Sequence, residues 1–294
     1  MIERKSSIIA LERAMANYRF RGNATNPWGP LFNALHVAMT DGLEIYVNIG
    51  DSKERIAGGG DAKYYVPLFT DQKEMQKGGP MSVINVSLEK LFSKVEDQNF
   101  LGYYLNPYSN QIQIGKDIIK KLLVYQPRPQ ICVLTRSVVD MQVGAIVNAA
   151  NASLLGGGGV DRAIHAAAGP ELHEACKRLG GCEPGKAKIT KAYGIQHADY
   201  IIHAVSPIYH GTEQDEELLA SCYTASLDLA LDNGCTSIAL PSLATGGHGY
   251  PLDEAAEVAV ESVRAWLDSH PDVVMDIYFC CFRKEERAVY DSLV

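Results

Sequence analysis

The 294-residue sequence contains no apolar run of the ~18 residues that a membrane-spanning helix needs. Its first residues, from Met1 to Ser6, also lack the apolar core and small-residue cleavage site of a secretory leader. Basic side chains are in deficit, since 27 Lys and Arg face 35 Asp and Glu for a formal net charge of -8. Non-specific nucleic-acid binding requires Lys and Arg to displace counterions from phosphates. We therefore expect a soluble, cytoplasmic chain with neither a membrane nor a nucleic-acid partner.

Metal-binding motifs and a disulfide framework are also missing. The seven cysteines fall without regular spacing, and no CxxC pair or Cys/His cluster has the spacing of zinc ligands. Cys280 and Cys281 are neighbours in an apolar run, which indicates reduced core cysteines in a buried strand. The sequence thus predicts no metal and no cofactor.

A connector divides the chain into two parts. Two prolines lie two residues apart in the segment from Val124 to Gln130, where they favour an extended backbone after a predicted helix. A chain of this length can hold two ordinary domains. We predict one domain over residues 1–125 and a second over residues 129–294.

The first part shows mixed helical and strand patterns, which predict a small α+β domain. Helical spacing covers residues 8–18, 30–39, 88–95 and 117–123. Strand-like runs cover residues 44–49, 64–69, 81–86, 101–105 and 111–114.

The second part alternates apolar strands with helices, which predicts an α/β sheet covered on both faces. The predicted strands are residues 130–134, 145–148, 200–205, 237–240 and 273–282. The predicted helices are residues 162–168, 171–179, 216–233, 252–268 and 284–293.

A glycine-rich loop lies between the strand at 145–148 and the next helix. Four consecutive glycines, Gly156 to Gly159, precede a first helical turn that carries Asp161. Such a loop can be a purely structural turn, or its backbone N–H groups and the helix start can bind a diphosphate. Two amides at the strand end, Asn148 and Asn151, favour the binding interpretation because they can hydrogen-bond a ribose hydroxyl.

A second glycine-rich loop, from Pro241 to Pro251, also follows an apolar strand and precedes a helix. Loops at the carboxyl ends of parallel strands meet in one crevice, which is where an open α/β sheet binds its ligand. We therefore expect the two loops to converge on one anionic ligand.

These motifs resemble the macrodomain family over the whole second part, and the MacroD-type ADP-ribosylhydrolases and O-acetyl-ADP-ribose deacetylases most of all. The resemblance implies a three-layer α/β/α fold with a mixed central sheet that binds ADP-ribose or ADP-ribosylated protein. The matching motifs are Asn148–Asn151, Gly156–Asp161, Ala163–Gly169, Gly181–Cys182, Ala187–Thr190, Ile202–His203 and Thr245–Gly246.

The resemblance also implies the roles of individual residues. Asn151 would bind the distal ribose, Asp161 would orient or activate a water, and His165, one turn later, would either support that carboxylate or take part in the chemistry. The residues expected to bind ligand are Ser137, Asn148, Gly156, Gly157, Gly158, Gly159, Val160, Ser242, Ala244, Thr245, Gly246, Gly247, His248, Gly249 and Tyr250.

Two positions depart from the family pattern. Ser137 stands where macrodomains commonly have the aspartate that binds the adenine amino group, and His248 replaces an aromatic residue of the second loop. Three interpretations remain open: a hydrolase of ADP-ribose adducts, a non-catalytic reader of ADP-ribose, and an adaptor that recruits a protein.

The first part resembles the SseB N-terminal-like domain of bacterial proteins. The resemblance lies in the segment from Tyr65 to Asp71, in Leu105 to Pro107, and in a short strand that leads into the helix near Asp117. It implies an interaction module that binds a protein partner and contributes no catalytic residue.

Overall fold

The computed structural model describes residues 6–18, 28–48, 56–57, 64–70, 72–77, 83–93, 100–109 and 111–294. Predicted features at residues 49, 71, 81–82 and 94–95 lie outside these ranges. The chain divides into two compact units, of which the second comprises Arg128–Val294 and the first comprises the described residues up to Pro127.

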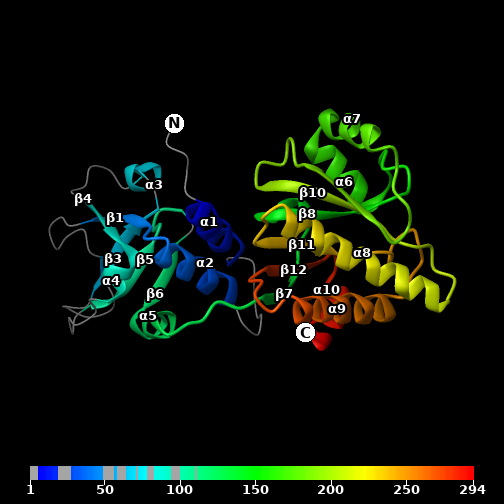
Figure 1. Ribbon diagram of the computed structural model, residues 1–294. Coiled ribbons are helices and arrows are strands. Elements are labelled where there is room, and N and C mark those ends of the chain that lie inside the picture. Colours follow the sequence, from blue (N-terminus) through cyan, green and yellow to red (C-terminus); the bar gives the residue numbers. More distant parts are fainter. Residues whose placement is uncertain are drawn as a thin grey trace. The chain divides into compact units, whose positions relative to one another are not determined.

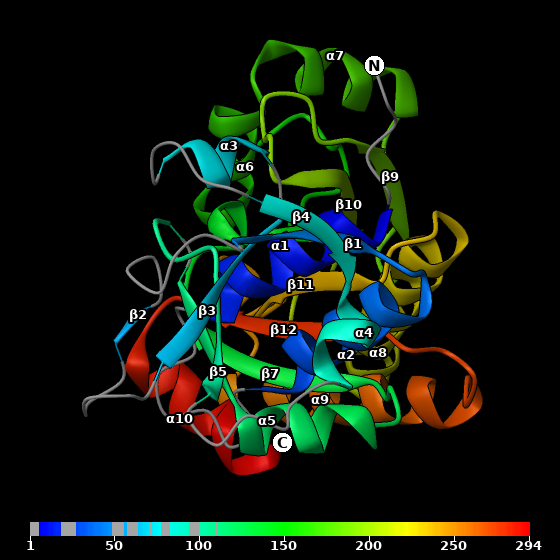
Figure 2. The same cartoon turned by 90° about the vertical axis from the view of Figure 1, so that its left-hand side faces the viewer.

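The first unit is built on one sheet in the order β4-β1-β3-β5-β6, with β2 paired to β3. Figure 2 shows β4, β1 and β3 as neighbouring arrows. The strands β3 and β5 are parallel, and the other pairs are antiparallel. The strands are β1 (Glu44–Asn48), β2 (Ile56–Ala57), β3 (Tyr64–Phe69), β4 (Val83–Ser87), β5 (Phe100–Leu105) and β6 (Ile112–Gly115).

Helices provide the other half of this unit's core. Apolar residues that recur at helical spacing on α1 and α2, such as Leu11, Met15 and Leu35, are buried against strand residues such as Ile45 and Leu105. The helices are α1 (Ser6–Tyr18), α2 (Gly29–Thr40), α3 (Gln72–Gln76), α4 (Leu88–Phe92) and α5 (Lys116–Leu123). The unit is therefore α+β, and the short α3 and β2 are additions to the predicted elements.

The second unit has a mixed sheet in the order β7-β12-β11-β8-β10-β9. Five strands are parallel, and β9 is antiparallel at one edge. The strands are β7 (Gln130–Thr135), β8 (Val143–Ala150), β9 (Ala187–Lys191), β10 (Ala198–Val205), β11 (Ser237–Pro241) and β12 (Asp276–Cys281).

Helices cover both faces of this sheet, as Figure 1 shows with α6 and α7 on one side and α8 to α10 on the other. Side chains alternate along β8, so Val147 packs in the layer of α8 and α9 while Ile146 packs in the layer of α6 and α7. The helices are η2 (Val138–Asp140), α6 (Gly159–Ala168), α7 (Pro170–Leu179), α8 (Glu213–Asp232), α9 (Leu252–Ser269) and α10 (Lys284–Leu293). The three-layer α/β/α prediction is confirmed.

Two local features differ from the predictions. The edge strand β9 was not predicted, since it carries two lysines and lacks the apolar run of its buried neighbours. The helix α8 begins at Glu213 rather than residue 216, because Thr212 and Asp215 form a capping box that fixes the start. Among the described residues, no helix is long and apolar enough to cross a membrane.

Candidate functional site

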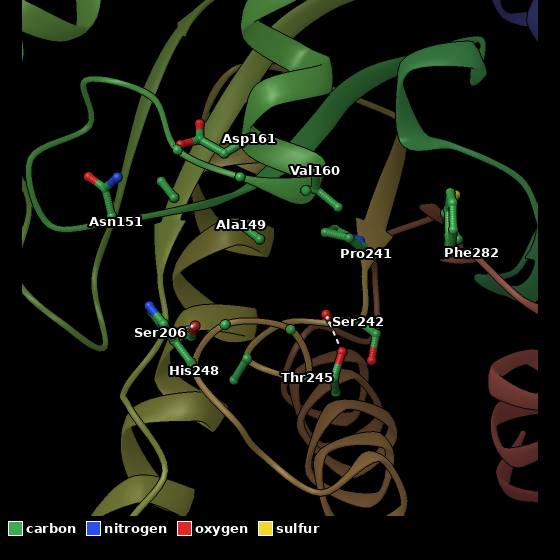
Figure 3. A pocket seen from close by; sticks show the side chains of 18 of the residues that line it. Ala149, Asn151, Val160, Asp161, Ser206, Pro241, Ser242, Thr245, His248 and Phe282 are labelled. Carbon is green, nitrogen blue, oxygen red and sulfur yellow. Dashed lines mark hydrogen bonds between the residues drawn. The ribbon is translucent and has the colours of Figure 1, made fainter.

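The two glycine-rich loops lie at the same edge of the second unit's sheet. Loop 1 (residues 151–158) joins β8 to α6, and loop 2 (residues 242–251) joins β11 to α9. Because β8 and β11 are parallel neighbours, both loops leave the sheet at its carboxyl edge. They enclose a cleft of about 490 Å³ (Figure 3). The predicted convergence of the loops is confirmed.

The cleft is lined by loop residues and by segments distant in sequence. Its walls comprise Ala149, Ala150, Asn151, Gly157, Gly158, Gly159, Val160, Asp161, Ser206, Pro241, Ser242, Ala244, Thr245, Gly246, Gly247, His248, Cys280, Phe282, Arg283 and Glu286.

Loop 1 has a fixed, unusual backbone. Leu154 has a φ of 62° and Gly156 a φ of 95°, and such left-handed values carry strain for a residue with a side chain. The Leu154 side chain is buried in the core beside α6, which offsets that strain. The loop is therefore held in one conformation by packing beneath it.

Asn151 organises this turn. Its Oδ1 accepts hydrogen bonds from the backbone N–H groups of Ser153 and Leu154, while its Nδ2 donates to the Gly156 carbonyl at 2.8 Å. An amide nitrogen has two hydrogens, so one N–H of Nδ2 stays available at the cleft wall. Asn151 thus has a structural role in the turn besides the ribose contact expected from the sequence.

The start of α6 presents unsatisfied backbone donors to the cleft. Its N-cap residue, Gly158, makes no side-chain cap hydrogen bond, and the first helical residues Gly159 and Val160 line the cleft. Uncapped N–H groups at a helix start, together with the positive end of its dipole, attract an anion.

Asp161 lies between this helix start and the sheet. Its carboxylate is almost fully buried, and Oδ1 accepts a hydrogen bond of 2.7 Å from Asn148 Nδ2. No hydrogen-bond partner of Oδ2 occurs among the described residues. A Cβ placed on Gly157 would lie 3.0 Å from Oδ2, a contact tighter than side chains normally make, so glycine lets the loop backbone approach this carboxylate closely.

Asn148 is enclosed behind the cleft rather than part of its wall. Its side chain is fully buried, and Nδ2 donates one hydrogen to Asp161 and the other to Nδ1 of His203, 3.1 Å away. Asn148 therefore does not line the cleft, and its direct contact with ligand stays a prediction. Its amide orients Asp161, which is a contact that strand position alone could not reveal.

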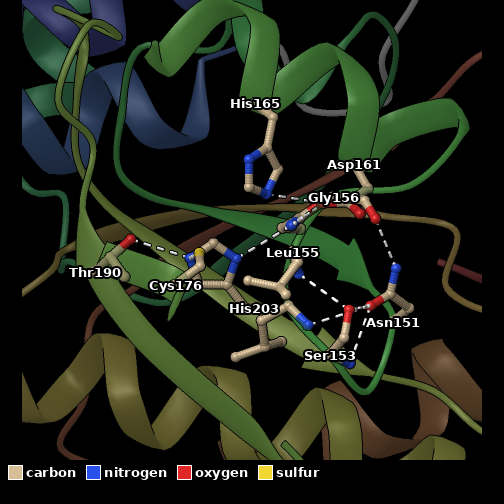
Figure 4. Close-up of polar contacts among 11 residues, drawn as sticks. Asn151, Ser153, Leu155, Gly156, Asp161, His165, Cys176, Thr190 and His203 are labelled. Carbon is tan, nitrogen blue, oxygen red and sulfur yellow. Dashed lines mark hydrogen bonds and ion pairs between the residues drawn. The ribbon is translucent and has the colours of Figure 1, made fainter. Parts of the chain in front are cut away.

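His203, on β10, completes this buried chain of hydrogen bonds (Figure 4). Since Nδ1 accepts from Asn148, the proton resides on Nε2, which lies 3.0 Å from Thr190 Oγ1 and 3.6 Å from Cys176 Sγ. Burial, with a smaller contribution from the charge of His165, lowers the pKa of His203 to about 4. The ring is neutral at physiological pH.

His165 approaches the same carboxylate from α6. Its Nε2 lies 3.4 Å from Asp161 Oδ1, one helical turn away, and its side chain is mostly buried. The residue is not part of the cleft wall. Of the two roles considered from the sequence, its position favours support of the Asp161 carboxylate over a part in the chemistry.

Loop 2 is anchored from below by two buried tyrosines. Tyr223 accepts a hydrogen bond from the Leu243 N–H, and the Tyr290 hydroxyl donates to Ser242 Oγ at 3.1 Å. Ala244 has a left-handed φ of 65°, so loop 2 carries backbone strain as loop 1 does.

His248 lies on the cleft side of loop 2. Its Nδ1 is 2.9 Å from the hydroxyl of Ser206, a buried residue that directly follows β10. The hydrogen bond orients the imidazole ring toward the cleft, as Figure 3 shows. Ser206 was not predicted from the sequence, because no motif connects it with the glycine loops.

The far end of the cleft is formed by residues that the sequence did not reveal. Phe282, at the end of β12, is 84% exposed and lines the cleft beside Arg283 and Glu286. Glu286 accepts from the backbone N–H groups of Phe282 and Arg283, which fixes this turn. No sequence motif indicates Phe282. Its role is suggested only by the structure, in which a large aromatic ring is exposed at the cleft.

Six predicted site residues, Asn148 and His165 included, lie outside the cleft wall. Ser137 accepts from Val139 N–H at the start of η2, and Tyr250 is buried against Tyr209. The predicted residues absent from the wall are Ser137, Asn148, Gly156, Gly249, Tyr250 and, among the catalytic candidates, His165. All the other predicted site residues contribute to it. Within the described ranges, no group of three or more His, Cys, Asp and Glu is placed to bind a metal ion.

Comparison with known proteins gives consistent matches to the second unit. The family model described as Macro domain matches residues 147–259. The chain is 51% identical over 156 residues to the Macro domain-containing protein CT2219 of Chlorobaculum tepidum, which covers 53% of this chain and 90% of that protein.

It is also 40% identical over 207 residues to the ADP-ribose glycohydrolase MACROD2 of Xenopus laevis, which covers 70% of this chain. The match spans only 47% of that relative's length. Among solved structures, the Trypanosoma brucei macrodomain in complex with ADP-ribose superposes with a TM-score of 0.53 at 38% identity, covering 57% of this chain and 75% of the other.

Proposed function

The chain belongs to the macrodomain family, and from this premise we propose that its second unit binds ADP-ribose and hydrolyses ADP-ribose adducts. The substrates are mono-ADP-ribosyl groups on acidic side chains, O-acetyl-ADP-ribose, or both. The observation that carries the hydrolase proposal is the buried Asp161 carboxylate, whose Oδ2 lies at the cleft wall without a hydrogen-bond partner among the described residues.

The diphosphate fits between the two loops. Backbone N–H groups at the uncapped start of α6 face it from one side, and the glycines Gly246 and Gly247 approach it from the other. These donors are neutral backbone groups, which is how a chain with a net charge of -8 binds an anion. The distal ribose then lies near Asn151 and Asp161.

Asp161 acts on a water molecule in this arrangement. Its Oδ2 accepts one proton of the attacking water. For an acidic side chain the water oxygen attacks the anomeric carbon of the distal ribose, and the bond from that carbon to the leaving carboxylate breaks. For O-acetyl-ADP-ribose the water oxygen attacks the acetyl carbonyl carbon, the bond from that carbon to the ribose oxygen breaks, and the ribose oxygen takes the proton back from Asp161. The products are ADP-ribose and a free carboxylate, acetate in one case and the protein side chain in the other. Asn148 and His203 hold the carboxylate in position, and the bound diphosphate supplies most of the substrate orientation.

At the opposite end, Phe282 binds the adenine. Its exposed ring offers a stacking face, and base–aromatic stacking contributes about 1–3 kcal/mol per base. We expect Phe282→Ala to weaken ADP-ribose binding about tenfold and Phe282→Tyr to leave it nearly unchanged, as measured by calorimetry. Ribose 5-phosphate, which lacks adenine, is the matched control ligand. Equal losses for both ligands would place the adenine elsewhere.

A non-catalytic reader is the second candidate, favoured by His248 and Ser137, which depart from the family pattern. Incubating the wild-type protein with a mono-ADP-ribosylated protein and with O-acetyl-ADP-ribose separates the two functions. Release of ADP-ribose or acetate supports the hydrolase. If calorimetry shows ADP-ribose binding but neither substrate is turned over, the protein is a reader. If ADP-ribose does not bind, both functions are rejected.

The first unit, residues 1–125 in our division of the chain, is proposed to be an SseB-like module that binds a protein partner. The support is the similarity of its sequence motifs and its α+β architecture. An affinity experiment with the full chain and with matched substitutions on this unit would identify such a partner.

A further inference from the structure

A second hollow lies on the outer side of loop 1, separated from the cleft by Gly157. Its volume is about 490 Å³, and Gly157 belongs to the walls of both hollows. Among its other wall residues are Leu155, Arg162, His165, Pro170 and His173. We call it the outer hollow.

The wall of the outer hollow contains one arginine, two histidines and no acidic residue. Arg162 is exposed, and its guanidinium makes no hydrogen bond or ion pair with another described residue. The rings of His165 and His173 lie 6.3 Å apart, edge to face. The hollow therefore has one permanent positive charge and two imidazoles that can donate hydrogen bonds.

The outer hollow adjoins the end of the cleft where Asn151 and Asp161 lie. In Figure 3 these two residues lie far from Phe282, at the other end of the cleft. With the adenine at Phe282 and the distal ribose at Asp161, as in the proposed function, whatever is attached to the distal ribose leaves the cleft beside Gly157. A substituent leaving there passes directly to the outer hollow.

We propose that the outer hollow binds an acidic segment of the ADP-ribosylated polypeptide, next to the modified side chain. The inference rests on the proposed function. Arg162 pairs with a carboxylate of this segment, and His173 donates a hydrogen bond to it. Leu155 and Pro170 provide apolar contact for the chain between them. The hollow thereby selects among modified proteins by the charge beside the modification.

The test compares two peptides that carry one ADP-ribosyl group on a glutamate. One has acidic flanking residues, and in the other these are replaced by glutamine. Binding is measured by calorimetry in an Asp161→Asn background, in which we expect turnover to be slow. We expect the acidic peptide to bind about tenfold more tightly, and Arg162→Glu to abolish that preference. Free ADP-ribose should bind equally well with or without the Arg162 substitution.

Arg264→Glu is the matched control, since Arg264 is an exposed arginine on α9, in the opposite helical layer. It should leave the peptide preference unchanged. Equal affinities of the two peptides, or a preference for the acidic peptide that survives Arg162→Glu, would overturn the inference. The proposed function would still stand in that case, provided that the wild type binds ADP-ribose. A loss of free ADP-ribose affinity in Arg162→Glu would also overturn it, because Arg162 would then contact the nucleotide itself. Absence of ADP-ribose binding by the wild type would reject the proposed function and this inference with it.

Discussion

Asp161→Asn is expected to slow hydrolysis of O-acetyl-ADP-ribose by about 100- to 10,000-fold, the usual contribution of a general base. Asparagine has the size of aspartate, and its Oδ1 can still accept the hydrogen bond from Asn148. It cannot accept the proton of the attacking water. ADP-ribose binding, measured by calorimetry, should therefore change by less than about threefold, so the loss falls on kcat.

Asp253→Asn is the control for this experiment, because Asp253 is exposed in the first turn of α9 and lies outside the cleft wall. It should retain wild-type turnover. If Asp161→Asn keeps more than about a tenth of the wild-type kcat, the role of Asp161 as general base is wrong.

His203 is expected to make the second unit lose stability at mildly acidic pH. In the unfolded chain its pKa has an ordinary value near 6.5, while burial lowers the pKa to about 4 in the folded chain. Above about pH 6.5 both states are neutral, so His203 has no effect there. As the pH falls from about 6.5 to about 4, the unfolded state binds a proton that the folded state excludes. The free energy of unfolding then falls by about 3 kcal/mol, and His203 causes no further loss below about pH 4.

His203→Asn should remove this part of the pH dependence, because asparagine does not titrate and its carbonyl can accept from Asn148. Urea unfolding is measured between pH 4 and pH 8 in both proteins. The chain has two tryptophans, Trp28 in the first unit and Trp266 in the second. A Trp28→Phe background therefore makes fluorescence a reporter of the second unit alone.

The variant is expected to be less stable than the wild type at pH 8, and the gap between them should narrow by about 3 kcal/mol on reaching pH 4. Three other groups face the His203 ring or its partner Asn148, namely His165, Asp161 and Cys176. They are present in both the wild type and His203→Asn. If the difference in free energy of unfolding between the two proteins stays constant from pH 8 to pH 4, His203 is not the group responsible.

The strands and loops that position the cleft could be predicted because their signals are local. Apolar runs identified β8, β10 and β11, and the glycines of each loop directly follow a strand. Parallel strands then required both loops to meet at one edge. The edge strand β9 is short and carries two lysines among its five residues, so its sequence lacks this signal.

Roles that depend on contacts between distant residues could not be predicted. Asn148 turns away from the cleft because His203, 55 residues later, provides an acceptor for one of its hydrogens. Phe282 and Ser206 line the cleft through the pairing of their strands and belong to no glycine motif. Sequence position identified the two loops that line the cleft, but burial and hydrogen bonding decide which of their residues face it.

The hydrogen bond between Tyr290 and Ser242 couples the last helix to the cleft. Tyr290 lies on α10, near the end of the chain, while Ser242 begins loop 2, and Glu286 of the same helix is part of the cleft wall. Unfolding of α10 would remove one of the two tyrosine anchors of loop 2 and one residue of the cleft wall in a single event. Local unfolding of α10 would therefore weaken ligand binding, and bound ligand would in turn stabilise α10.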